Sequence, residues 1–131
     1  MIKVKDDDNC TFCKQAPETL AHMFWYCHRV QLFINSVKTY IAREYKIQLN
    51  INTKTWFFPT KMSAADTCII TLAKLVIYDA RYKETQPNVM HLKNKLKWEA
   101  EIEFHAAISA NKLHKFENKW GPMKDIHVQL D

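Results

Sequence analysis

The sequence contains a single glycine, Gly121, among its 131 residues. Tight β-hairpins use turns with positive backbone φ, which draw heavily on glycine, so this scarcity argues against a β-rich fold. It also excludes the glycine-rich loops that cradle phosphate groups in nucleotide-binding proteins. A helical fold with few turns has no comparable need for glycine. We therefore expect a mostly α-helical protein.

Long apolar runs are also missing. Apolar residues make up 47% of the chain, but no run approaches the roughly 20 residues that a membrane helix needs. The first residues, MIKVKDDDN, are charged and contain no apolar signal-peptide core. We expect an intracellular protein, nuclear or cytoplasmic, with no membrane partner and no small-molecule substrate. In a reducing compartment, disulfides are a poor explanation for the four cysteines.

The formal charge of +5 is unevenly distributed. Residues 28–86 carry nine basic and four acidic side chains, whereas residues 1–27 carry three basic and four acidic ones. The middle of the chain is therefore the basic part. A moderate positive excess of this kind suits a polyanionic partner without requiring one.

Hydrophobic periodicity predicts about three long helices. Apolar residues recur at the i, i+3, i+4, i+7 spacing of a buried helical stripe in the ranges 19–44, 63–84 and 89–119. Residues 47–51 instead alternate between apolar and polar, which favours a short extended segment. We expect a metal module at residues 1–30 packed on a helical bundle at residues 31–131, together forming one compact unit.

Cys10, Cys13, His22 and Cys27 have the spacing of a metal site. Two thiolates three residues apart can bind one ion from a tight turn, and a His and a Cys near the start of a helix can complete a tetrahedron. Three thiolates and one imidazole favour Zn²⁺, and four protein ligands leave no position for a catalytic water. We expect one structural zinc ion. A Cys10–Cys13 redox pair, incidental packing, and His28 as a ligand in place of His22 are the alternatives.

The same stretch carries a family resemblance. CTFCKQAPETLAHMFWYC, residues 10–27, resembles the zinc-binding segment that follows the reverse transcriptase in LINE-type non-LTR retrotransposon proteins. AAISANKLHKFENKWGP, residues 106–122, is similar to the helical ends of those proteins. The resemblance implies the C-terminal zinc-binding domain of such a protein, or a domesticated derivative. It also implies binding of element RNA or target DNA, and other domains of the same protein as partners.

No enzyme signature accompanies this resemblance. Some relatives carry a restriction-like endonuclease whose metal site needs a Pro-Asp pair, but the four prolines here precede Glu18, Thr60, Asn88 and Met123. A polymerase does not fit in 131 residues. We therefore expect a non-enzymatic protein.

Candidate nucleic-acid contacts come from cations and one aromatic ring. We predict a basic strip from the zinc turn along the first helix, with Phe12 as an exposed ring that stacks on bases; the strip consists of Lys14, Arg29, Lys38, Arg43 and Lys46. Phe24 and Trp25 are expected in the core. RNA or single-stranded DNA is favoured, because no duplex-recognition helix is evident.

Two alternatives to this interface remain open. The cations can form an ordinary solvated face, and a second basic patch can lie around Pro87, made of Arg81, Lys83, Lys93, Lys95 and Lys97. A protein-interaction module that docks on a polymerase domain, or that forms a homodimer, is the rival function. Clustered cations would favour nucleic acid, whereas dispersed cations and an exposed apolar patch would favour docking.

Overall fold

The computed structural model describes residues 8–123, so the outer ends of both predicted units lie outside the described residues. The elements are η1 (His22–Tyr26), α1 (His28–Tyr45), α2 (Thr53–Phe57), α3 (Ala64–Lys83), α4 (Val89–Ser109), α5 (Leu113–Trp120) and η2 (Gly121–Met123). This part of the chain contains no β-strand, only an isolated bridge between Asn9 and Pro17. The predicted helical fold class is confirmed. None of the described helices is long and apolar enough to cross a membrane.

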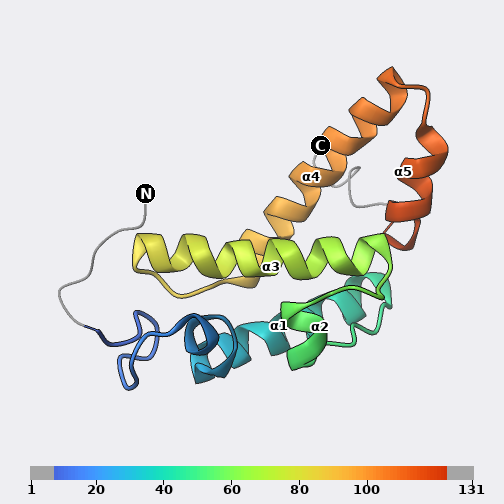
Figure 1. The fold of residues 1–131 in the computed structure, drawn as a ribbon. Helices are drawn as coiled ribbons and strands as arrows, with labels where there is room; N and C mark the ends of the chain where they lie inside the picture. Colours follow the sequence, from blue (N-terminus) through green and yellow to red (C-terminus); the bar gives the residue numbers. More distant parts are fainter. Residues whose placement is uncertain (1–7, 124–131) are drawn as a thin grey trace.

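Helix α3 is the central element of the fold (Figure 1). Residues 8–27, the described part of the metal module that precedes α1, lie with α1 and α2 on one side of α3 (Figure 1). The outer part of α4 and all of α5 project on the other side. Buried residues from Cys10 to Met123 form one hydrophobic cluster, so the metal module and the helices share a core.

The sequence of α3 explains its central place. The Ser63 side chain caps the helix by accepting a hydrogen bond from the Asp66 N–H, and Asp66 suits the positive end of the helix dipole. Seven of its residues are buried, all small or β-branched: Ala65, Ile69, Ile70, Ala73, Val76, Ile77 and Ala80. Such side chains let other helices approach closely on both sides of α3.

The helix predicted over 19–44 is interrupted at Cys27. Residues His22–Tyr26 form a π-helix, Cys27 has an extended backbone with ψ of 130°, and α1 then starts at His28. The apolar period continues through this point, so the sequence pattern conceals the break. The buried stripe of α1 agrees with the prediction and consists of Val30, Phe33, Ile34, Val37, Tyr40 and Ile41.

Residues 47–51, predicted to be an extended connector or a short strand, form a connector and not a strand. These residues are irregular, with Leu49 buried, and α2 starts shortly after them, at Thr53. A reciprocal capping box starts α2: the Asn52 side chain accepts from the Thr55 N–H, and the Thr55 hydroxyl accepts from the Asn52 N–H. The capping box therefore determines that residues 53–57 are helical, and the alternation of apolar and polar residues before it does not produce a strand.

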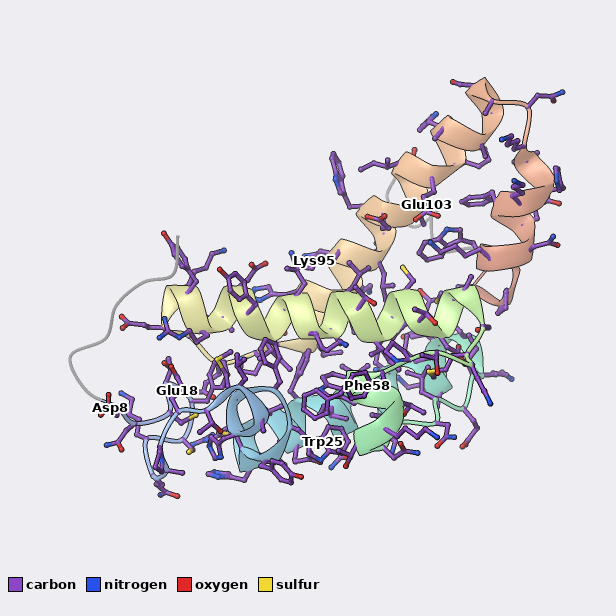
Figure 2. All side chains as sticks on the ribbon, in the orientation of Figure 1. Asp8, Glu18, Trp25, Phe58, Lys95 and Glu103 are labelled. Carbon is purple, nitrogen blue, oxygen red and sulfur yellow. The ribbon has the colours of Figure 1, made fainter. Side chains whose placement is uncertain are left out.

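The helix predicted over 89–119 is in fact two helices, and α5 folds back beside α4 (Figure 2). Asn111 adopts a left-handed backbone with φ of 55°. The N–H groups of Asn111 and Lys112 donate to the carbonyls of Ile108 and Ala107, as in a Schellman motif. Asparagine tolerates this conformation better than most residues, so Asn111 replaces the usual glycine.

Polar contacts hold the α4–α5 hairpin closed. Glu103, labelled in Figure 2, accepts from the Lys119 ammonium at 2.9 Å and from the Trp120 indole N–H at 3.1 Å. The rings of Phe104 and Phe116 meet edge to face, with their centroids 5.3 Å apart. Near the crossing of α4 with α3, Lys95 pairs with Asp79 at 2.9 Å.

Candidate metal centre and basic surface

A tight turn presents the first two cysteines. The Lys14 N–H donates to the Cys10 carbonyl, and the Cys10 N–H donates to the Ala16 carbonyl, which closes the turn on itself. Lys14 has a positive φ of 57°, and the next N–H, of Gln15, points at the Cys13 sulfur at 3.5 Å. The backbone therefore brings both sulfurs to one side of the turn.

The π-helix brings His22 and Cys27 to the same site. Thr19 caps the preceding turn by accepting from the His22 N–H, and the Cys27 N–H then donates to the His22 carbonyl at 2.8 Å. In an α-helix, residues four apart lie above one another; in a π-helix the bonded residues are five apart. The wider turn therefore places His22 and Cys27, which are five residues apart, on the same side.

The four ligand atoms lie within 4.8 Å of one another. The Cys10 and Cys27 sulfurs are 3.8 Å apart, and the Cys13 sulfur is 3.4 Å from His22 Nε2. A tetrahedral ion with metal–sulfur bonds of about 2.3 Å and metal–nitrogen bonds of about 2.0 Å requires sulfur–sulfur separations of about 3.8 Å and sulfur–nitrogen separations of about 3.5 Å. The cluster therefore fits one tetrahedrally bound metal ion.

Two cysteines of the cluster, Cys13 and Cys27, have thiol pKa values that are shifted in opposite directions. Burial raises the pKa of the Cys27 thiol to about 11, although the N–H groups of Val30 and Arg29 act against this. Burial also acts to raise the pKa of Cys13, but the Gln15 N–H and the His22 ring outweigh it and lower the value to about 7. A cation bound between the sulfurs would stabilise both thiolates, because ligand deprotonation and metal binding are linked.

The alternative interpretations of this cluster fit less well. All four cysteines are free, and Cys10 and Cys13 converge with His22 and Cys27 in one cluster instead of forming an isolated pair. His28 is exposed and does not belong to the cluster of His, Cys and acidic residues found in the described part of the chain. The geometry thus selects His22 over His28.

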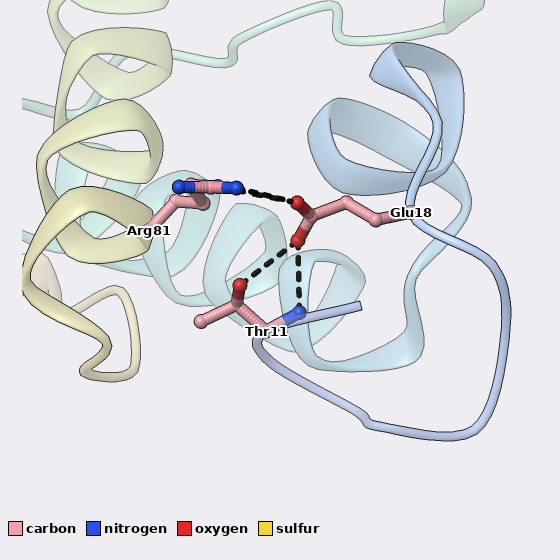
Figure 3. Close-up of polar contacts among 3 residues, drawn as sticks. All are labelled: Thr11, Glu18 and Arg81. Carbon is pink, nitrogen blue, oxygen red and sulfur yellow. Dashed lines mark hydrogen bonds and ion pairs between the residues drawn. The ribbon is translucent and has the colours of Figure 1, made fainter. Parts of the chain in front are cut away.

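A mostly buried carboxylate, that of Glu18, joins the metal module to α3 (Figure 3). Glu18 Oε1 accepts from Arg81 Nε at 3.2 Å and Nη2 at 3.0 Å, and Oε2 accepts from the Thr11 N–H and hydroxyl, both at 2.9 Å. The two charged side chains are only 13% and 12% exposed. Gln86 adds a second link by donating to the Phe12 carbonyl. These contacts fix the cysteine turn against α3.

Replacing Glu18 with Gln should lower the free energy of unfolding by about 2 kcal/mol. The Arg81 guanidinium then loses its negatively charged partner at a site with little solvent access. Urea denaturation measures this loss. Glu117→Gln is the matched control, since Glu117 is exposed on α5 and should change stability by less than about 0.5 kcal/mol. Equal stability of the two variants would contradict a structural role for the Glu18–Arg81 pair.

Side chains satisfy the backbone at the end of the π-helix. The Trp56 indole N–H donates to the Phe24 carbonyl at 2.7 Å, and the Gln31 amide donates to the Trp25 carbonyl at 2.6 Å. Trp25 also packs on Trp56, with centroids 5.8 Å apart. Phe24 and Trp25 are partly buried against the core, as expected. The role of Trp56 was not predicted, because its partner lies 32 residues earlier.

The predicted basic strip is divided by the geometry of α1. Lys14, Arg29, Lys38, Arg43 and Lys46 are all exposed. Arg29 and Lys38 are separated by about two and a half turns, which places them on opposite flanks of the helix. Arg29 and Arg43 share a flank but lie about 21 Å apart along the axis. The five cations therefore do not form one strip, and by the criterion of clustering they do not by themselves favour nucleic-acid binding.

Phe12 was predicted to be an exposed ring for base stacking, and this prediction is wrong. Its side chain is 3% exposed, because the cysteine turn folds inward and buries Cys10 and Phe12 in the common core. The exposed aromatic ring of the metal module is Tyr26, at 65%. Tyr26 follows Phe24 and Trp25 in the sequence, and its place on the π-helix is what directs it to solvent.

A groove between α1 and α4 brings two cations together. Arg43 and Lys93 line it with the polar side chains of Asn35, Ser36 and Thr39, and its volume is about 470 Å³. Lys93 belongs to the predicted second basic patch, so this groove combines one residue from each predicted patch. Lys97 lies one turn further along the same flank of α4.

Comparisons of the chain with models of protein families, with curated proteins and with solved structures find no match. The resemblance to LINE-type retrotransposon proteins therefore depends on the motif residues alone.

Proposed function

We propose that this chain is a zinc-stabilised, non-enzymatic module that binds RNA or single-stranded DNA. We further propose that it corresponds to the C-terminal zinc-binding domain of a LINE-type non-LTR retrotransposon protein, or to a domesticated derivative. The ligand order, Cys10, Cys13, His22 and Cys27, is that of the family, and the four ligand atoms converge. The observation that carries nucleic-acid binding is the polar groove with Arg43 and Lys93.

Zinc is the metal that suits this set of ligands. Three sulfurs and one imidazole nitrogen are soft or borderline donors, which disfavour magnesium and calcium. Four protein ligands complete a tetrahedron and leave no place for a reactive water, which is the pattern of structural zinc sites. Bound zinc would hold the cysteine turn against the start of α1.

The groove between α1 and α4 has the chemistry that a nucleic-acid strand requires. Arg43 and Lys93 can neutralise phosphates, and the side chains of Asn35, Ser36 and Thr39 can hydrogen-bond phosphates, sugars or base edges. Leu32 and Met90, which are 59% and 52% exposed, offer apolar contact to bases. The only carboxylate in its lining is that of Glu44, whose Oε1 lies 4.0 Å from Arg43 Nε and competes with phosphate for that cation. Flexible single strands can follow such a shallow surface more readily than a duplex can.

Fluorescence anisotropy of the zinc-loaded protein with labelled single-stranded RNA, single-stranded DNA and duplex DNA tests this proposal. We expect affinity to fall linearly with log[salt], and Arg43→Ala and Lys93→Ala each to reduce the slope by about one unit. Lys61→Ala is the control, because Lys61 is exposed beside α2, outside the groove. Absence of binding at low salt by folded, zinc-loaded protein would refute the proposal, as would equal effects of all three substitutions.

A further inference from the structure

The two residues that separate the first two metal ligands, Thr11 and Phe12, are both held by side chains from outside the cysteine turn. The Thr11 N–H and hydroxyl donate to Glu18 Oε2, both at 2.9 Å. The Phe12 carbonyl accepts from the side-chain amide of Gln86 at 3.1 Å, and Gln86 lies 74 residues further along the chain. The conformation of the turn therefore depends on residues that supply no ligand atom.

Glu18 connects the ligand-bearing elements to α3. Its Oε2 accepts from Thr11, and its Oε1 accepts from Nε and Nη2 of Arg81, which lies in the last turn of α3 (Figure 3). The next residue, Thr19, accepts from the His22 N–H and caps the turn that leads to the second pair of ligands. Glu18 thus lies between the two pairs of ligands in the sequence and is bonded to α3 in the fold.

The contacts of Glu18 require a carboxylate. Its two oxygens accept at the same time from Thr11 and from Arg81, whereas a glutamine amide has a single acceptor oxygen and would turn N–H donors toward one of these partners. The side chains of Glu18 and Arg81 are only 13% and 12% exposed, so water replaces a lost contact poorly. Loss of the carboxylate would therefore free the cysteine turn or break its link to α3.

On the basis of the zinc centre proposed above, we propose that the end of α3 holds the cysteine turn in its metal-binding conformation, with Glu18 as the positioning residue. Groups that orient metal ligands without binding the ion change metal affinity by about tenfold to a hundredfold when they are removed. Arg81 acts on the ligands only through Glu18, which is 63 residues away in the sequence. The affinity for zinc is then set partly by a helix that contributes no ligand.

The coupling also acts in the opposite direction. A contact that favours metal binding is itself favoured by the bound metal, by the same free energy. Bound zinc should therefore strengthen the contacts that the cysteine turn makes with Arg81 and Gln86. Gln86 lies in the connection between α3 and α4, so the ion would also stabilise the path of the chain between these two helices.

The zinc affinity of the full chain, measured by competition with a chelator of known affinity, tests this proposal. We expect Glu18→Gln to weaken zinc binding about tenfold or more. Glu103→Gln is the matched control, because Glu103 accepts from Lys119 and Trp120 in the α4–α5 hairpin, on the other side of α3 from the metal module. It breaks a comparable set of contacts and should change zinc affinity less than about twofold.

Replacement of Arg81 tests whether the support comes from α3. Arg81→Met should weaken zinc binding about threefold to tenfold, and its combination with Glu18→Gln should add little, because either change breaks the same link. Lys83→Met is the control, since Lys83 is exposed at the same end of α3 and should leave the affinity unchanged. In urea denaturation, Glu18→Gln should destabilise the zinc-loaded protein more than the chelated protein.

Zinc binding by Glu18→Gln as tight as that by Glu103→Gln would overturn the proposal. Equal destabilisation by Glu18→Gln with and without zinc would also overturn it, because Glu18 would then support the fold without acting on the ligands. Absence of zinc binding by the unmodified protein would refute the zinc centre itself, and the role of Glu18 toward zinc with it. Measurement of the unmodified protein therefore distinguishes the two failures.

Discussion

Removal of the proposed zinc ion by a chelator should unfold the metal module and lower the Tm of the protein by about 10 °C or more. The module has few apolar side chains of its own in the core, chiefly Phe12 and Met23, and two of its ligands, Cys10 and Cys27, are fully buried. Without an ion, those sulfurs lose the charge that compensates their burial. Circular dichroism and thermal melting of the zinc-loaded and chelated protein measure the effect.

Single substitutions show which cysteines hold the ion. Cys27→Ser should abolish stoichiometric zinc binding, whereas Cys68→Ser is the control, because Cys68 lies on α3 outside the cluster. Zinc released from each variant is measured with a colorimetric chelator. Cobalt substitution provides a second readout, since tetrahedral thiolate coordination gives a characteristic absorption spectrum. An unchanged Tm after complete removal of zinc would contradict a structural role for the metal.

Truncation of Trp56 to Ala should lower the free energy of unfolding by about 3–5 kcal/mol. Trp56 is 0% exposed, packs on Trp25, and donates its indole N–H to the Phe24 carbonyl. Its own carbonyl accepts from Lys74, so the residue connects α2, α3 and the π-helix. The truncation leaves a large cavity and also deprives a carbonyl of its donor.

Trp56→Phe separates packing from hydrogen bonding. A phenyl ring retains much of the apolar contact but lacks the N–H, so we expect a loss of about 1–3 kcal/mol. Trp98→Ala is the control, because Trp98 is 66% exposed on α4 and should change stability by less than about 0.5 kcal/mol. Urea denaturation compares the three variants. A loss for Trp56→Phe as small as that for Trp98→Ala would mean that the indole hydrogen bond contributes nothing.

The metal cluster could be predicted from the sequence because its evidence is local and chemically distinctive. Cys10, Cys13, His22 and Cys27 lie within 18 residues, and few other functions need three thiols and an imidazole at that spacing. The buried stripe of α1 could also be predicted, because apolar residues that recur with the period of an α-helix lie on the face that the helix buries. Both predictions depend on residues that are close together in the chain.

The helix boundaries could not be predicted in the same way. The apolar period continues through Cys27 and Asn111, so nothing in the pattern marks the places where the backbone leaves the α-helix. The Asn52–Thr55 capping box is a recognisable signature, but the alternation before it favoured an extended segment. Capping and turn chemistry outweighed periodicity at each of these positions.

Tertiary contacts between residues far apart in the chain could not be predicted from the sequence either. Glu18 and Arg81 are 63 residues apart, and no spacing rule connects them. The burial of Phe12 has the same origin, because it depends on how the cysteine turn meets the remaining core.

The π-helix determines how an insertion or a deletion of one residue before Cys27 would affect the fold. One extra residue in a continuous α-helix would rotate everything after it by about 100° and remove the stripe of α1 from the core. A π-helical turn takes up one additional residue before Cys27, so the register of α1 is preserved. The five-residue interval between the third and fourth ligands therefore serves both the cluster and the register of α1, and we expect an insertion or a deletion of one residue there to disturb both.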